Sequence, residues 1–282
     1  MKRINKIKMG ITLMTIPALM GSIYCIKYKS NTTVCAFYAM RSPVWELPAD
    51  EEKNVGKINR RDFKGKYDKE VYLTFDDGPS RQNTVNIMDI LLKNGVKASF
   101  FIVGNAAERN KEIIQKLDQN DMCILPHSHT HDYSIYKNTD SYFEDLYKNI
   151  AVIENLTGRG IAPFMRMPGG STNTIANKVN AAVIKNGIKR KGLRYVDWNV
   201  SSTDASAITV DSNIIKSAVI SKCKNLKFAV VLMHDAPTKT TTVQALPEII
   251  KFFKENGYEF RTFKDITPEE EEEMVRRKII NR

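Results

Sequence analysis

The chain has 282 residues, of which 42% are hydrophobic, and it carries a formal net charge of +11. This length suffices for one large domain with appended segments, and the hydrophobic content excludes a largely disordered chain. The positive charge predicts attraction to polyanions, but the basic residues are scattered and form no recognised module for reading nucleic acid. An anionic cell wall or membrane surface therefore fits the charge better than nucleic acid does.

Residues 1–26 are typical of an exported protein. Basic residues precede an apolar run from Met9 to Ile26, which predicts a secretion signal or an N-terminal membrane anchor. The run is slightly short for a bilayer span, which takes about 20 residues, and long for the core of a cleaved signal. Small residues would permit cleavage after Ala36, but Lys27 and Lys29 lie in between. We therefore favour an uncleaved anchor over cleavage, and an extracytoplasmic location in either case.

Residues 27–66 are polar, contain Pro43 and Pro48, and show no sustained period. This composition indicates a linker or stalk.

From Val71 onward, short β-branched or aromatic runs alternate with helical patterns. Strands are predicted over residues 71–75, 98–103, 122–125, 163–165, 194–198, 228–233 and 258–263. Helices are predicted over residues 84–93, 109–117 and 141–156, where apolar residues recur at helical spacing. The repeated order of strand and helix predicts a parallel sheet, either open and doubly wound or closed into a barrel.

The positions of reactive side chains decide between an open sheet and a barrel. They follow the carboxyl ends of different predicted strands and are Asp76, Asp77, His127, Arg166, Asp197, Trp198 and His234. A closed barrel brings all of these strand ends to one rim, whereas an open sheet would separate the outer ones. We therefore expect an α/β barrel.

Asp76 and Asp77 follow the first predicted strand and precede Gly78. An isolated Asp-Gly is most often only a turn. Two adjacent carboxylates, however, push each other's pKa values apart, so an ionised pair at a strand end indicates a nearby cation or arginine.

Three of the 4 histidines lie within residues 127–131, and the fourth, His234, follows another predicted strand. Imidazoles at positions i and i+4, here His127 and His131, can bring two ring nitrogens to one metal, with a carboxylate as third ligand. We do not expect His129 to be a ligand, because the geometry favours the outer pair. Packing in a core would not produce this pattern.

The C-terminal residues 266–282 begin with a capping box at Thr267 and Glu270, with Pro268 at the first helical position. Basic residues at the far end complement the helix dipole. We expect a solvated terminal helix.

The four cysteines are Cys25, Cys35, Cys123 and Cys223. No two have metal-site spacing. An exported protein could pair Cys123 with Cys223, but the spacing does not decide this.

Five motifs between residues 67 and 265 resemble, in order, those of the polysaccharide deacetylase family, the metal-dependent carbohydrate esterases with a NodB-homology domain. They are Thr74-Phe75-Asp76-Asp77-Gly78, His127-Ser128-His129-Thr130-His131, Arg166-Met167-Pro168-Gly169-Gly170, Trp198-Asn199-Val200-Ser201-Ser202-Thr203-Asp204 and Leu232-Met233-His234. Each motif alone is weak evidence, but five in order are strong. The resemblance implies a distorted (β/α) barrel of about seven parallel strands.

The resemblance also implies roles for the first motifs. Asp77, His127 and His131 would bind one divalent metal ion, with zinc suggested by the family and cobalt, nickel or manganese admitted by mixed nitrogen and oxygen ligands. Asp76 would be the base that takes a proton from water, and Arg166 would hold it ionised and oriented.

The remaining motifs imply residues for the leaving group and the substrate. His234 would protonate the departing nitrogen. The backbone around Pro168 and Gly169 would share the oxyanion with the metal. Trp198 and Leu232 are candidates for the apolar walls around the acetyl methyl, although either could equally be ordinary core.

The fourth motif departs from the family pattern. Ser201 and Ala205 stand where many members have an Asp that assists the acid histidine and a Trp in the acetyl pocket. Asp204 is retained, and Asp197 could substitute for the missing carboxylate. The sequence therefore does not decide which carboxylate assists His234.

The leading hypothesis is an extracytoplasmic, metal-dependent N-deacetylase that acts on the N-acetylglucosamine of peptidoglycan. An anchor, a stalk and a positive surface suit an enzyme that works on the wall beside its own membrane. The partner is an acetylated wall glycan, and no protein partner is implied. Chitooligosaccharides, poly-N-acetylglucosamine, muramic acid and acetylxylan are alternative substrates.

Two other classes of function are compatible with the residues. A carbohydrate-binding relic would keep the groove without turnover, but the intact set of candidate residues argues against decay. A metal-dependent phosphoesterase would need further carboxylates for a second metal, and none stands near these motifs.

Overall fold

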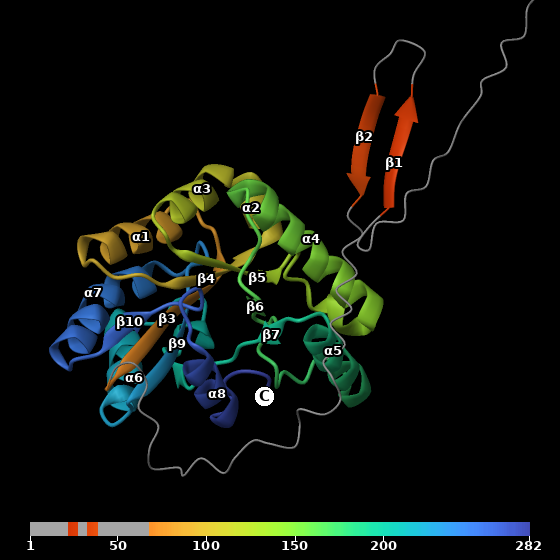
Figure 1. The fold of residues 1–282 in the computed structure, drawn as a ribbon. Helices are drawn as coiled ribbons and strands as arrows, with labels where there is room; N and C mark the ends of the chain where they lie inside the picture. The colour runs from red at the N-terminus through yellow and green to blue at the C-terminus, as the bar shows by residue number, and fades with distance from the viewer. Residues whose placement is uncertain (1–21, 28–32, 39–67) are drawn as a thin grey trace, which may run out of the picture. The chain divides into compact units, whose positions relative to one another are not determined.

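The computed structural model describes residues 22–27, 33–38 and 68–282 (Figure 1), the first two ranges by their backbone alone. β1 (Ser22–Lys27) and β2 (Thr33–Tyr38) pair antiparallel within a first unit, Met1–Val55. The sequence pattern predicts neither strand. Most of the predicted anchor and stalk lies outside the described residues. Within the described ranges, no helix combines the length and the apolar character that crossing a bilayer requires.

The second unit, Gly56–Arg282, is built on parallel strands. One sheet has the order β5-β4-β3-β9-β8, and β10 also pairs with β3. Its strands are β3 (Glu70–Gly78), β4 (Ser99–Val103), β5 (Cys123–Ser128), β8 (Val200–Ser201), β9 (Phe228–His234) and β10 (Glu259–Arg261). A second parallel pair consists of β6 (Phe164–Met165) and β7 (Arg194–Tyr195).

The second pair continues the curve of the main sheet. The backbone N–H of Arg166, just after β6, donates to the carbonyl of Pro126 in β5 at 3.1 Å. After β7, Val196 forms an antiparallel bridge with Ile280 near the C-terminus. The C-terminal segment thus fills the place where β7 and β8 do not pair. The α/β fold with a distorted barrel is confirmed, and the predicted strand 194–198 is shortened to β7.

Helices surround the strands (Figure 1). They are α1 (Asn83–Lys93), α2 (Gly104–Arg109), α3 (Lys111–Gln119), α4 (Thr139–Thr157), α5 (Lys178–Arg190), α6 (Ser212–Cys223), α7 (Thr240–Glu255) and α8 (Pro268–Arg276), with the 3₁₀ helices η2 (Tyr133–Lys137) and η3 (Asp204–Ser206). The three helices predicted inside the domain correspond to α1, α3 and α4. Gly158 ends α4 with φ of 69°, as its freedom at positive φ permits.

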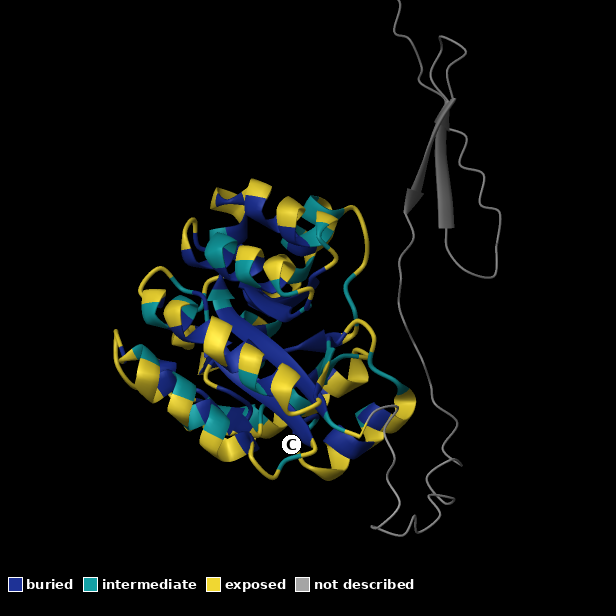
Figure 2. Cartoon of the chain, turned by 90° about the vertical axis from the view of Figure 1, so that its left-hand side faces the viewer, coloured by how far each residue is buried: buried dark blue, intermediate teal, exposed yellow. Residues whose placement is uncertain are grey.

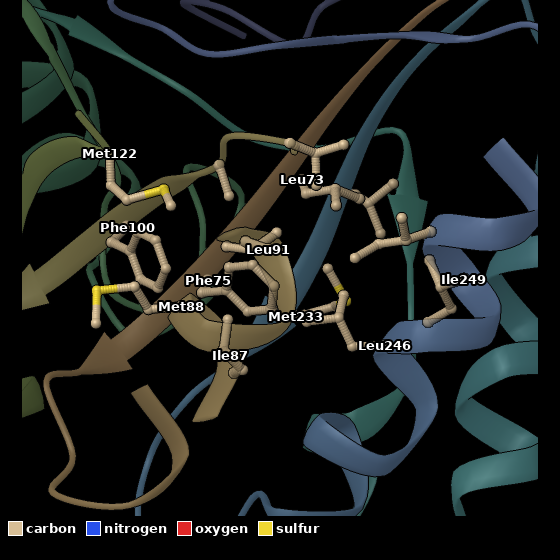
Figure 3. Close-up of a cluster of buried hydrophobic side chains, with 14 of the residues drawn as sticks. Leu73, Phe75, Ile87, Met88, Leu91, Phe100, Met122, Met233, Leu246 and Ile249 are labelled. Atoms are coloured by element: carbon tan, nitrogen blue, oxygen red, sulfur yellow. The ribbon is translucent and has the colours of Figure 1, made fainter. Parts of the chain in front are cut away.

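The largest hydrophobic cluster lies between the sheet and α1 and α7 (Figure 3). Leu73 and Phe75 of β3 point into it, whereas Tyr72 points into a second cluster inside the barrel. Both faces of β3 are therefore covered, as expected for a parallel strand. Figure 2 shows the same division, with buried strands inside and helices that expose their outer faces.

The C-terminal helix α8 is solvated along one face, as expected, but its other face is buried. The capping box of Thr267 and Glu270 does form at the start of α8. Met274, Ile279 and Ile280, however, are at most 1% exposed and join the cluster inside the barrel. The segment packs because its apolar residues meet the open side of the strands.

Cys123 and Cys223 are both buried and free. They belong to different hydrophobic clusters, Cys123 inside the barrel and Cys223 between sheet and helices. The pairing that the sequence leaves open does not form.

Candidate metal and catalytic site

The end of β3 directs its two carboxylates differently. The pairing of β3 with β4 shifts register between Asp76 and Gly78, and Asp77 has φ of 74°. Bulges of this kind re-aim a side chain, and a positive φ at a residue other than glycine is a strained conformation typical of functional sites. The irregularity separates the roles that two neighbouring carboxylates can take.

Asp77, His127 and His131 come together at this end of the barrel. One possible ligand atom from each lies within 4.8 Å of the others. Oδ1 of Asp77 is 3.1 Å from Nε2 of His131 and 3.5 Å from Nε2 of His127. The same oxygen is buried and has no hydrogen-bond partner among the described residues. An orphaned carboxylate oxygen between two imidazole nitrogens is a donor set that fits a divalent metal such as zinc.

The pKa of Asp77 agrees with a role as metal ligand. Burial would raise the pKa of Asp77, but the neighbouring His127 and His131 outweigh burial and hold the pKa well below its ordinary value. Asp77 is therefore ionised, as a metal ligand must be.

His127 is oriented by the backbone. Its Nδ1 lies 2.8 Å from the carbonyl oxygen of Arg166. An N–H at Nδ1 that donates to this carbonyl leaves the lone pair of Nε2 facing Asp77 and His131. This tautomer is the one that a metal ligand needs.

Asp145 of α4 clamps the loop that carries the histidines. Its Oδ2 accepts hydrogen bonds from Ser128 Oγ at 2.6 Å and from the N–H of His129 at 2.8 Å, and its Oδ1 accepts from the N–H and Oγ1 of Thr130 at 2.9 and 2.7 Å. Ser128 Oγ in turn accepts from the N–H of His131 at 2.9 Å. Since His131 has φ of 57°, these bonds hold a strained turn in place.

Sequence reasoning missed Asp145. The only signal was a carboxylate on the side of the 141–156 helix that also carries Tyr142, Leu146 and Asn149, all of them buried with Asp145. A charged residue on a buried face indicates a specific partner.

His129 is 2% exposed and lies outside the group of possible ligands.

Arg166 and Asp76 form a buried ion pair beside the possible metal ligands. Arg166 is fully buried, and its Nη1 donates to Asp76 Oδ1 at 2.7 Å and to Thr74 Oγ1 at 2.8 Å. The guanidinium also lies 4.1 Å from the ring centre of Phe101. Oδ2 of Asp76 faces the other way, 4.0 Å from Nε2 of His127. One oxygen of Asp76 is thus anchored, and the other is placed to act as a base.

His234, at the end of β9, is paired with Asp204. Nδ1 of His234 lies 2.8 Å from Asp204 Oδ1, and its backbone N–H donates to Oδ2 at 2.8 Å. Thr242 Oγ1 donates to the same Oδ2 at 2.9 Å. Burial would lower the pKa of His234, but the hydrogen bond and charge of Asp204 outweigh it and raise the pKa to about 9. His234 is therefore a protonated donor at neutral pH.

This pairing answers the question that the fourth motif leaves open. Asp204 assists His234, so Ser201 and Ala205 do not leave it without a carboxylate. Asp197 contacts Ser171 instead, accepting from its N–H at 2.8 Å and from its Oγ. It holds the loop after β6.

That loop carries the remaining candidates. Tyr136 donates to the carbonyl of Pro168 at 2.9 Å, and Gly169 has φ of 74°. Trp198 is half-buried and so close to Gly170 that an added Cβ there would lie 2.9 Å from the indole ring. Leu232 of β9 is 7% exposed. Contact of these residues with substrate stays a prediction.

A cleft adjoins Asp77 and His131. It has a volume of about 570 Å³ and extends over the loop after β3 and along α2. A cavity of this size admits a sugar residue.

The comparisons with known proteins agree with this arrangement. Residues 64–189 match a family model described as polysaccharide deacetylase. A peptidoglycan-N-acetylglucosamine deacetylase of Bacillus cereus is 28% identical over 269 residues, which covers 93% of this chain and 94% of the relative. A second such protein from the same organism is 31% identical over 207 residues, covering 71% of this chain and 69% of the relative.

A solved structure shows the same fold. The catalytic domain of a peptidoglycan N-acetylglucosamine deacetylase from Eubacterium rectale is 33% identical and superposes with a TM-score of 0.65. The match covers 71% of this chain and 90% of that domain.

Proposed function

Because the chain belongs to the polysaccharide deacetylase family, we propose that this hydrolase removes the N-acetyl group from the N-acetylglucosamine of peptidoglycan, using one divalent metal ion, zinc. The observation that carries the proposal is the convergence of Asp77, His127 and His131 beside an Asp76 that Arg166 anchors. The relatives named as peptidoglycan deacetylases support the substrate, since one matches along 93% of the chain.

Each group at the site would have its own role in the hydrolysis. The metal, when bound, would supply Lewis acidity toward the acetyl carbonyl and the attacking water. Asp76 would take the proton from that water through the carboxylate oxygen that Arg166 leaves free. His234 would give its proton to the departing amine, and the N–H of Gly169 would share the developing oxyanion.

We further propose that the enzyme works outside the cytoplasm, held at the membrane by its N-terminal segment. The basic start and the apolar run from Met9 to Ile26 support this location. The net charge of +11 would favour contact with an anionic wall.

The direct test is acetate release from purified peptidoglycan by zinc-loaded protein, with chitooligosaccharides and acetylxylan in parallel. We expect release from peptidoglycan, loss of activity after chelation, and recovery on adding zinc. Release only from another glycan would show that peptidoglycan is not the substrate. Activity that survives complete removal of the metal would overturn the metal dependence.

The same assay tests the carbohydrate-binding relic. A relic would bind peptidoglycan and zinc and yet release no acetate from any glycan. The intact ion pair of Asp76 with Arg166 and the pairing of Asp204 with His234 favour the enzyme.

A further inference from the structure

We propose that the cleft beside Asp77 and His131 is a subsite for a carboxylate group of the glycan, and that Arg81 and Arg109 bind this carboxylate. The inference rests on the proposed function, since it concerns the substrate of the same site. It specifies an acidic glycan instead of a neutral one. We call this hollow the arginine cleft.

The arginine cleft continues directly from the possible metal ligands. Asp77 and His131 line one part of it, and Arg81 and Arg109 line another. Arg81 lies in the loop after β3, and Arg109 is the last residue of α2, which follows β4. Because β3 and β4 are neighbours in the sheet, the two arginines stand over adjacent strand ends. A sugar next to the reacting one would therefore reach them.

Arg81 is held in place by a buried amide. Its Nε donates to Oδ1 of Asn110 at 3.2 Å, and Asn110 is only 7% exposed. Nδ2 of Asn110 donates to the carbonyl of Ala106 at 2.9 Å, which fixes the amide to α2. This anchoring uses Nε of Arg81 and leaves its terminal nitrogens for a ligand. A guanidinium arranged in this way is pre-organised for a carboxylate.

The charge of the cleft is unbalanced. Within residues 68–282, neither Arg81 nor Arg109 forms an ion pair with an acidic side chain. Among the described residues that line the cleft, Asp77 is the sole acid, and it belongs to the candidate metal site. Two exposed arginines without an acidic partner among the described residues, beside a hydrolytic centre, would attract an anion.

The chemical groups of the glycan indicate which anion the two arginines would bind. A chain of N-acetylglucosamine alone is neutral, so it offers hydroxyl and amide oxygens but no charged acceptor to two guanidinium groups. A wall glycan carries carboxylates from two sources: the lactyl ether of muramic acid where no stem peptide is attached, and the stem peptide itself where one is. Both present the planar, two-oxygen acceptor that arginine binds in a bidentate manner. The arginine cleft therefore favours carboxylate-bearing glycans over chitin-like ones.

The test compares kinetics on three glycans of matched length. The first carries stem peptides, the second has been stripped of peptides so that its lactyl carboxylates are free, and the third is a neutral chitooligosaccharide. The variants are Arg81→Gln, Arg109→Gln and the double change. Arg190→Gln, at the exposed end of α5, is the matched control because it lies outside the cleft.

We expect the double variant to raise KM for an acidic glycan about tenfold, the loss of roughly one charge-assisted contact, with kcat unchanged. The neutral glycan and the Arg190→Gln control should be unaffected. An effect confined to the stripped glycan would assign the lactyl carboxylate, and one confined to the peptide-bearing glycan would assign the stem peptide. Equal changes on all three glycans, or none, would overturn the proposal.

Binding without turnover separates this inference from the proposed function. Calorimetric titration of the stripped glycan and of the chitooligosaccharide into zinc-loaded Asp76→Asn, which should keep its metal without turnover, should show tighter binding of the acidic chain. Adding Arg81→Gln and Arg109→Gln to this variant should abolish the difference. If acetate release failed on every glycan, the proposed function would fall while this measurement still tested the arginine cleft. Equal affinity for both chains would contradict the inference.

Discussion

The pairing of Asp204 with His234 makes a prediction about pH. The pKa of His234 is raised to about 9, above the ordinary 6.5, so the charged donor persists up to that pH and the rate should fall as pH rises through it. Asp204→Asn removes the charge that raises the pKa. The alkaline limb of kcat/KM against pH should therefore move to lower pH.

Thr242→Val is the matched control for Asp204→Asn. It deletes a hydrogen bond to the same carboxylate and keeps the charge, so the alkaline limb should stay near that of the wild type. An unchanged limb in Asp204→Asn would show that His234 is not the proton donor.

The clamp by Asp145 predicts a weakened metal site when it is removed. Asp145→Ala frees Ser128 and Thr130, and with them the strained turn at His131. Losses of supporting residues of this kind cost about 10–100-fold in metal affinity. Zinc titration should show such a loss, whereas Asp140→Asn, an exposed change on the same helix, should leave affinity unchanged. Full affinity in Asp145→Ala would refute the clamp.

Among single residues, the sequence predicts the candidate site residues that lie in its motifs. The fold does bring together Asp77, His127 and His131, which the motifs single out. It also resolves a choice between Asp197 and Asp204 that spacing cannot make. The motifs do not include Arg81, Arg109 or Asp145. These residues could not be predicted from the sequence, because their contacts form only when distant segments meet in the fold.

At the scale of elements, α8 makes a prediction about stability. Met274 is fully buried inside the barrel, whereas its neighbour Val275 is 44% exposed. Met274→Ala should lower the free energy of unfolding by about 2–5 kcal/mol, since it removes a buried side chain and leaves a cavity. Val275→Ala should stay within about 0.5 kcal/mol of the wild type. Denaturant unfolding measures both, and equal effects would contradict the packing of α8.

Local patterns predict some elements and miss others for identifiable reasons. The strands appear as runs of β-branched and aromatic residues, and α1 and α4 as periodic apolar faces that end at Asn94 and Gly158. α7 contains Pro247 in its interior, which argues against a helix when only local sequence is considered. α6 places Ile214, 57% exposed, beside the buried Ile215, so its apolar residues do not mark one clear face.

For the whole molecule, the distribution of reactive residues along the sequence predicts a barrel. It does not predict which segments close the barrel. Strand ends that carry chemistry must share a rim, and this argument predicts the barrel correctly. The bridge between Val196 and Ile280 joins segments far apart in the chain. The charged residues of α8 predict its solvated face, but not its buried face, because the surface that covers Met274 comes from distant segments of the chain.

The positive charge also acts on the whole molecule. With a net charge of +11, the protein should bind an anionic wall more weakly as salt rises. The contribution of the arginine cleft to KM should decrease in the same way, because an exposed guanidinium is screened by salt.

We propose that Asp76, anchored by Arg166 beside a metal ion held by Asp77, His127 and His131, is the base of the deacetylation. Acetate release from peptidoglycan by the wild type and by Asp76→Asn, with bound zinc determined in both, tests this role. We expect equal zinc content and a loss of about 10²–10⁴-fold in rate, the contribution of a general base. Undiminished release by Asp76→Asn with its zinc in place would show that Asp76 is not the base.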